Sequence, residues 1–127
     1  MIEVLNNKKK RIGFIEGKKF FNKKHELIGY LEGNIVKNNN GHNLLRLDQH
    51  DDIFLGSEPV GYILDSKIFI REEPIFEISK EAKKITSNQN KDALFLRGNG
   101  QTIDDIDYFG IITIFFESRW WNKIYNS

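Results

Sequence analysis

Two aspartate clusters are the candidates for carboxylate chemistry in this 127-residue chain. The first contains Asp48, Asp51 and Asp52, and the second contains Asp104, Asp105 and Asp107. Paired carboxylates can hydrolyse a substrate when their environments separate their pKa values. Neither cluster has the alternating oxygen ligands, turn glycine and closing glutamate of a calcium loop. The spacing favours solvated turn carboxylates, and a small hydrolase is the alternative.

The three histidines are His25, His42 and His50. The first two lie in equivalent turns of neighbouring sequence repeats, which could bring them near each other. A metal site needs further ligands at a fixed spacing, and the sequence has no cysteine and no such spacing. We therefore expect exposed turn histidines, with no metal and no cofactor.

Basic residues are concentrated in the first third of the chain, as Lys8, Lys9, Lys10 and Arg11 and as lysines at 18–19 and 23–24, with Phe20 and Phe21 between the last two pairs. Basic turns with interleaved aromatic rings can bind phosphates and bases. The formal net charge is only +1, however, so no basic field extends over the whole protein. Nucleic-acid binding through these turns is a weaker alternative than solvated lysines that discourage strand pairing.

Four side chains recur at intervals of 16 residues and form the most specific pattern: Phe14, Tyr30, Arg46 and Tyr62. Aromatic faces with one guanidinium suit a peptide, a sugar or a cation, although strand aromatics more often pack against the core. Trp120 and Trp121 follow the last apolar run. If they lie on a strand, they point to opposite faces, and an exposed Trp121 would mark an interface.

These residues belong to a tandem repeat whose copies begin at Ile12, Ile28, Leu44 and Val60. The runs are short, rich in β-branched and aromatic residues, and bounded by Gly, Asn and Asp, which is typical of strands. Alternation places four aliphatic residues on one face: Ile15, Leu31, Leu47 and Ile63.

Each repeat contains a second short strand, so the first half of the chain forms about four β-hairpins. The second strands are predicted near residues 20–21, 35–36, 53–55 and 68–70, and residues 2–5 form one from an incomplete earlier copy. Gly13, Gly29 and Gly61 leave room for a bend or for a neighbouring ring to lie over the backbone. Small β-units share one core, and closure about an axis removes exposed strand edges.

The motif carried by residues 12–15, 28–36 and 60–63 resembles the 4-fold β-flower family. These are small, mainly bacterial proteins in which four hairpins surround a pseudo-fourfold axis. The resemblance covers roughly residues 2–70, and residues 44–47 depart from it. It implies an all-β fold and no chemistry, because the family has no established activity.

The C-terminal part reads as a β-containing segment packed on the repeats. Strands are predicted at residues 75–78, 93–97 and 109–116, and the last is apolar on both faces, so it needs a partner. Ser79 begins the one plausible short helix. We expect one domain over residues 1–127, with hairpin repeats at 1–72 and a completing segment at 73–127.

No apolar run approaches the length that spans a bilayer, and the N-terminus has no apolar signal core, so a cytoplasmic protein without membrane contact is expected. The sequence favours a non-catalytic binding or interaction module, possibly self-associating through its last strand. Its expected binding residues are Phe14, Tyr30, Arg46, Tyr62 and Trp121.

Overall fold

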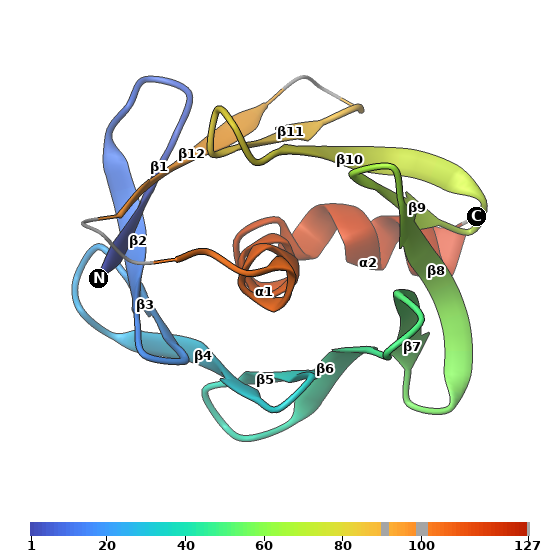
Figure 1. The fold of residues 1–127 in the computed structure, drawn as a ribbon. Coiled ribbons are helices and arrows are strands. Elements are labelled where there is room, and N and C mark those ends of the chain that lie inside the picture. The colour runs from blue at the N-terminus through green and yellow to red at the C-terminus, as the bar shows by residue number, and fades with distance from the viewer. Residues whose placement is uncertain (90–91, 99–101, 127) are drawn as a thin grey trace.

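Twelve antiparallel strands close into one barrel, and a helix runs through its interior (Figure 1). A computed structural model describes residues 1–89, 92–98 and 102–126. The strands are β1 (Ile2–Leu5), β2 (Arg11–Glu16), β3 (Lys19–Asn22), β4 (Leu27–Glu32), β5 (Ile35–Asn38), β6 (Asn43–Leu47), β7 (Asp52–Leu55), β8 (Glu58–Leu64), β9 (Lys67–Ile70), β10 (Glu73–Ser79), β11 (Lys84–Ser87) and β12 (Ala93–Gly98). They are followed by helices α1 (Asp105–Phe115) and α2 (Glu117–Asn126).

The predicted β-hairpin array is confirmed, but the fold is mostly β instead of all-β, and the ring has twelve strands instead of four hairpins about a fourfold axis. Each strand pairs with its neighbours in chain order, and β1 pairs with β12 to close the ring. The expected four hairpins account for only part of the barrel, since β10, β11 and β12 lie within the predicted C-terminal segment and complete it. Closure pairs the edges that a partial ring would expose.

The hairpins repeat in detail as well as in outline. A β-bulge interrupts the register at Val4/Leu5, Phe20/Phe21, Val36/Lys37 and Ile53/Phe54, about once per repeat. Bulges bend a strand and increase its twist, which is what a closing sheet needs.

The predicted aliphatic face points into the barrel. Ile15, Leu31 and Leu47 are buried, and Ile63 is half-buried against the same core. The repeat glycines also behave as expected. A Cβ at Gly13 would lie 2.7 Å from the Phe115 ring, and one at Gly29 would lie 2.5 Å from the Ile114 side chain. Both neighbours belong to α1, so the glycines let this helix approach the wall.

The predicted strand at residues 109–116 is wrong, because these residues form most of α1. The helix is apolar around its whole circumference, and it is buried from Asp107 to Thr113. A helix surrounded by a sheet has no polar face, so its sequence lacks the 3.6-residue alternation that identifies surface helices.

Two further local predictions are wrong. Ser79 ends β10 instead of starting a helix, and its hydroxyl accepts a hydrogen bond from the Ala82 amide in the turn to β11. Trp120 and Trp121 lie on α2, not on a strand. Trp120 is buried and donates its indole N–H to the Thr113 carbonyl at 2.8 Å, which fixes α2 against the end of α1. The two helices exceed the one short helix expected.

Candidate functional site

The four repeat residues face outward and are distributed around the barrel instead of converging. Phe14, Tyr30, Arg46 and Tyr62 lie on β2, β4, β6 and β8, so a strand separates each from the next. Neighbouring strands are about 4.8 Å apart, which sets roughly 10 Å between consecutive members.

Phe14, Arg46 and Tyr62 each contact an aromatic ring across their own hairpin. Phe14 stacks on Phe21 with centroids 4.9 Å apart, and Tyr62 stacks on Phe69 at 4.8 Å. The Arg46 guanidinium lies 4.4 Å from the Phe54 ring centroid. These pairs stabilise the outer wall and occupy one face of each ring.

Trp121 lies apart from the four repeat residues. It is half-buried on α2, with its ring 3.9 Å from Trp120 and stacked at 5.4 Å on Tyr125. Tyr125 is exposed. The structure therefore brings Trp121 together with aromatic residues of its own helix and not with the strand residues.

The aspartates of the two clusters have local partners. The Asp48 carboxylate accepts hydrogen bonds from the amides of His50 and Asp52, and these bonds hold the pKa of Asp48 below its ordinary value. Asp107 is buried, accepts the Asp104 amide at the start of α1 and lies 3.4 Å from Lys18.

Asp51 and Asp105, one from each cluster, meet at the α1 N-terminal end of the barrel. They line a shallow recess together with Lys80, which pairs with Asp105. The hydrogen bond from Lys80 to Asp105 raises the pKa of that lysine, so its ammonium fills the acidic recess. Among the described residues, no group of three or more His, Asp or Glu side chains could hold a metal ion.

The histidines and lysines lie mainly at turns. His25 packs edge-on against Phe14 with centroids 5.0 Å apart. Lys18 and Lys19 lie at the β2–β3 turn near the start of α1, whereas residues 8–10 and 23–24 lie at turns of the opposite barrel end. The basic runs are thus divided between two ends.

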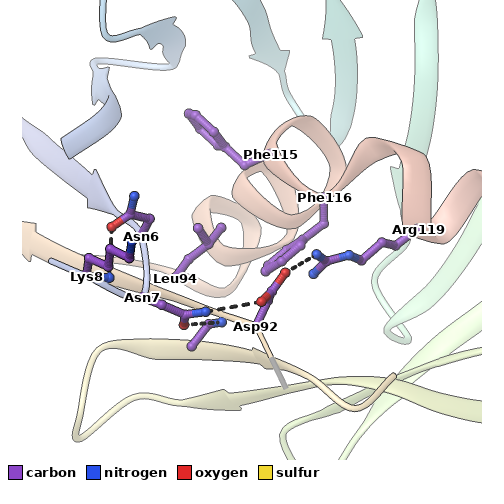
Figure 2. Close-up of a pocket in the computed structure, with 9 residues that line it drawn as sticks. Asn6, Asn7, Lys8, Asp92, Leu94, Phe115, Phe116 and Arg119 are labelled. Carbon is purple, nitrogen blue, oxygen red and sulfur yellow. Dashed lines mark hydrogen bonds and ion pairs between the residues drawn. The ribbon is translucent and has the colours of Figure 1, made fainter. Parts of the chain in front are cut away.

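A cavity lined by both polar and apolar groups lies where α1 meets α2 (Figure 2). We call it the junction recess. Its volume is about 390 Å³. It is lined by Asn6, Asn7, Lys8, Asp92, Ala93, Leu94, Phe115, Phe116 and Arg119. These residues come from the β1–β2 turn, the start of β12 and both helices.

A series of polar contacts crosses the recess from the β1–β2 turn to α2. The Asn7 amide donates to one Asp92 oxygen at 3.1 Å, and its carbonyl oxygen accepts the Ala93 amide at 2.7 Å. The other Asp92 oxygen pairs with Nη2 of Arg119, as Figure 2 shows. These contacts tie α2 to the barrel wall and place the Arg119 guanidinium beside the recess.

Apolar side chains form the remaining wall of the recess. The Arg119 guanidinium lies 4.9 Å from the centroid of the Phe116 ring, which is itself buried. Phe115 and Leu94 are adjacent. Nη1 of Arg119 is buried and donates to none of the described residues. An N–H donor left without an acceptor is costly, so an acceptor that entered the recess would be favoured there.

Sequence reasoning missed Asn7, Asp92 and Arg119 as site residues. Arg119 stands beside the noted tryptophans, but only the fold brings it to residues 27 and 112 positions earlier in the chain. No short-range pattern contains that information.

Comparisons of the chain with models of known families, with curated proteins and with solved structures find no match. None of the helices in the described ranges has the length and apolar content to cross a membrane.

Proposed function

We propose that this protein is a non-catalytic binding module whose ligand enters the junction recess. The ligand combines a hydrogen-bond acceptor of single negative charge with an apolar group. The observation that carries this proposal is the Arg119 guanidinium, which has one nitrogen paired with Asp92 and one buried nitrogen without an acceptor among the described residues.

The charge of the recess favours a monoanion. Arg119 is balanced by Asp92, and Lys8 is the other cationic residue in the lining. A carboxylate could accept from Nη1 after a small rotation of the guanidinium toward the recess. A phosphate dianion would face stronger repulsion from the Asp92 carboxylate. Leu94, Phe115 and Phe116 offer an apolar wall for the rest of the ligand.

The hydrolase alternative gains little support from the described groups. The carboxylates whose pKa is shifted, Glu3 and Asp48, both have a lowered pKa, which is the opposite of what a general acid needs. Membership of the 4-fold β-flower family is supported by the hairpin array, although the barrel has twelve strands. Because that family has no established activity, membership would not assign an activity to this protein.

Binding by the five residues that the sequence favoured stays a prediction. Phe14, Arg46 and Tyr62 each have a ring or guanidinium face covered by a cross-hairpin neighbour. Trp121 and the exposed Tyr125 could serve self-association through α2. The predicted route through the last strand has no support, because those residues form the enclosed helix α1.

The test uses 4-methylpentanoate, an apolar carboxylate, and its neutral amide as the paired probe. The acid should shift the backbone NMR resonances of Ala93, Leu94 and Phe116, and the amide should shift them less at equal concentration. Arg119→Lys keeps the charge beside Asp92 but removes the guanidinium fork, so it should weaken acid binding by several-fold. Arg97→Gln, which alters an exposed ion pair with Glu3, is the matched control.

Equal shifts from the acid and the amide would contradict the proposal, as would unchanged acid binding in Arg119→Lys. Thermal unfolding of both variants shows whether any loss of binding follows from a loss of folding.

A further inference from the structure

We infer that a groove on the outer wall, separate from the junction recess, binds a nucleobase that carries a phosphate. The groove lies beside the β2–β3 hairpin and has a volume of about 460 Å³. It is lined by Glu16, Gly17, Lys18, Lys19, Phe21, Tyr30 and Leu31. We call it the outer groove.

Two aromatic rings flank the outer groove at a separation set by strand register. Tyr30 pairs with Lys19 across β3 and β4, so Phe21 is its diagonal neighbour, two residues along β3. Diagonal neighbours on regular adjacent strands are about 7–8 Å apart, and the β-bulge at Phe20/Phe21 alters that spacing locally. A planar ring stacked between two others needs about that spacing, because each stacked contact takes roughly half of it.

The strand order leaves one face of Phe21 for the groove. Phe14 on β2 covers the other face, with centroids 4.9 Å apart and planes inclined by 14°. His25 packs edge-on against Phe14 in turn. A base in the groove would extend this array of rings by one member, toward Tyr30. Every base has a π-face, so such stacking tolerates any sequence.

Lysines at the mouth supply the charge that a phosphate needs. Lys19 is exposed, and the side chain of Lys18 keeps 57% of its surface exposed while it pairs with Asp107 at 3.4 Å. The groove also contains Glu16, which can accept a hydrogen bond from a base amino group. Asp107 offsets Lys18, so Lys19 is the ammonium group that remains to meet a phosphate.

The same position in other repeats lacks this arrangement. The corresponding diagonal pair one repeat later is Lys37 and Arg46, which has no ring. At β7–β8, Asp52 lies opposite Tyr62, where Lys19 lies opposite Tyr30, and Phe69 stacks on the Tyr62 ring. The outer groove thus has both an open ring face and adjacent lysines.

Fluorescence anisotropy with labelled single-stranded oligonucleotides of eight uridines tests the proposal, with competition by uridine monophosphate. Binding should weaken as salt rises, and Lys19→Gln should reduce both the affinity and the salt dependence. Lys67→Gln is the control, because Lys67 starts β9 as Lys19 starts β3 and lies outside the groove.

Tyr30→Leu should weaken binding about tenfold through the loss of stacking, and Tyr30→Phe should change it less than twofold. Tyr62→Leu, at the equivalent position two repeats later, should leave binding unchanged.

Competition by the monophosphate identifies a free nucleotide as a sufficient ligand, and binding of the oligonucleotide alone identifies a polymer; both outcomes support the site. No binding of either at low salt, or equal weakening by Tyr30→Leu and Tyr62→Leu, would overturn it. The junction recess resonances should not shift on nucleotide addition, so this result is independent of the carboxylate test.

Discussion

The ring of Phe115 lies against the backbone of Gly13, so the interior helix touches the barrel wall where a side chain is missing. A Cβ added at Gly13 would come within 2.7 Å of two ring atoms and would also overlap the Phe21 carbonyl oxygen. Leu45 occupies the equivalent position in the third repeat and is buried. The wall therefore admits the helix at Gly13 and Gly29 and a buried side chain at Leu45.

Gly13→Ala should destabilise the protein by about 1–3 kcal/mol, the usual cost of overpacking a core. The measurement is urea unfolding followed by circular dichroism. Leu45→Ala is the matched control, because it removes a buried side chain at the equivalent position where Gly13→Ala adds one. It should cost about 2–5 kcal/mol because it leaves a cavity. A Gly13→Ala variant as stable as the original chain would show that α1 does not press on β2.

Gly110→Ala tests the interior helix from its other side. Alanine favours a helix over glycine by about 1 kcal/mol, so an exposed helix would gain stability. Here a Cβ at 110 would overlap the Phe20 ring and lie 3.3 Å from Leu31, so we expect a net loss of about 1–3 kcal/mol.

The double variant Gly110→Ala, Phe20→Leu gives the control. Leucine removes the ring atoms that collide with the new methyl group, so the double variant should lose less stability than the two single variants combined. Strict additivity of the two losses in urea unfolding would contradict the contact.

The hairpin array could be predicted because its information is local. Each strand is short, each turn has residues that tolerate the required backbone, and the interval of 16 residues repeats the same pattern. The strands predicted at residues 75–78 and 93–97 are confirmed as β10 and β12. The sequence does not predict β11 or the closure of the barrel by these three strands, because they lack the Gly-aromatic motif of the repeat.

The interior helix escaped prediction for a physical reason. Residues 109–116 are rich in β-branched and aromatic types, and their apolar character is uniform around the helix. Such a run fits a strand buried on both faces equally well, and only the enclosing barrel decides between them. The need for a shielding partner was predicted correctly, since α1 is enclosed by the sheet.

The residues of the junction recess could not be predicted from the sequence, whereas one residue of the outer groove was among those it singled out. Alternation puts Tyr30 on the strand face opposite Leu31 but does not predict whether that face is exposed, and the structure shows that Tyr30 lines the outer groove. The junction recess joins Asn7, Asp92 and Arg119, which only ring closure and the return of the chain through the barrel bring together.

Asn22→Ala should destabilise the β3–β4 turn by about 1–2 kcal/mol, since Asn22 Oδ1 accepts two backbone hydrogen bonds. These come from Lys24 at 2.9 Å and Glu26 at 3.0 Å. Asn22→Asp should retain only part of the stability, because its carboxylate can accept the same amides but replaces the Asn22 amide that donates to Glu26 Oε1 at 3.0 Å. Thermal unfolding of the two variants beside Asn40→Ala, an exposed turn change, separates the side-chain role from turn position. Equal midpoints for Asn22→Ala and Asn40→Ala would contradict this role.

Asp48 accepts the same two turn hydrogen bonds as Asn22, but with a carboxylate that titrates. Its contribution to the stability of the protein should therefore depend on pH. The hydrogen bonds from the amides of Asp52 and His50 lower its pKa below the ordinary value of 3.8 in the folded chain. A lowered folded-state pKa contributes stability that is present above the unfolded pKa and is lost as pH falls through the folded pKa.

Asp48→Asn gives the turn the neutral acceptor found at Asn6, Asn22 and Asn38, and it removes this titration. The difference in urea midpoint between the original chain and Asp48→Asn should therefore be constant from pH 7 to about 5 and should shift against the original chain below about pH 4. Glu3, whose pKa is also lowered, titrates in both proteins and cancels from the difference. A midpoint difference that stays constant down to pH 2 would show that the carboxylate of Asp48 binds its turn amides no more strongly than an amide oxygen does.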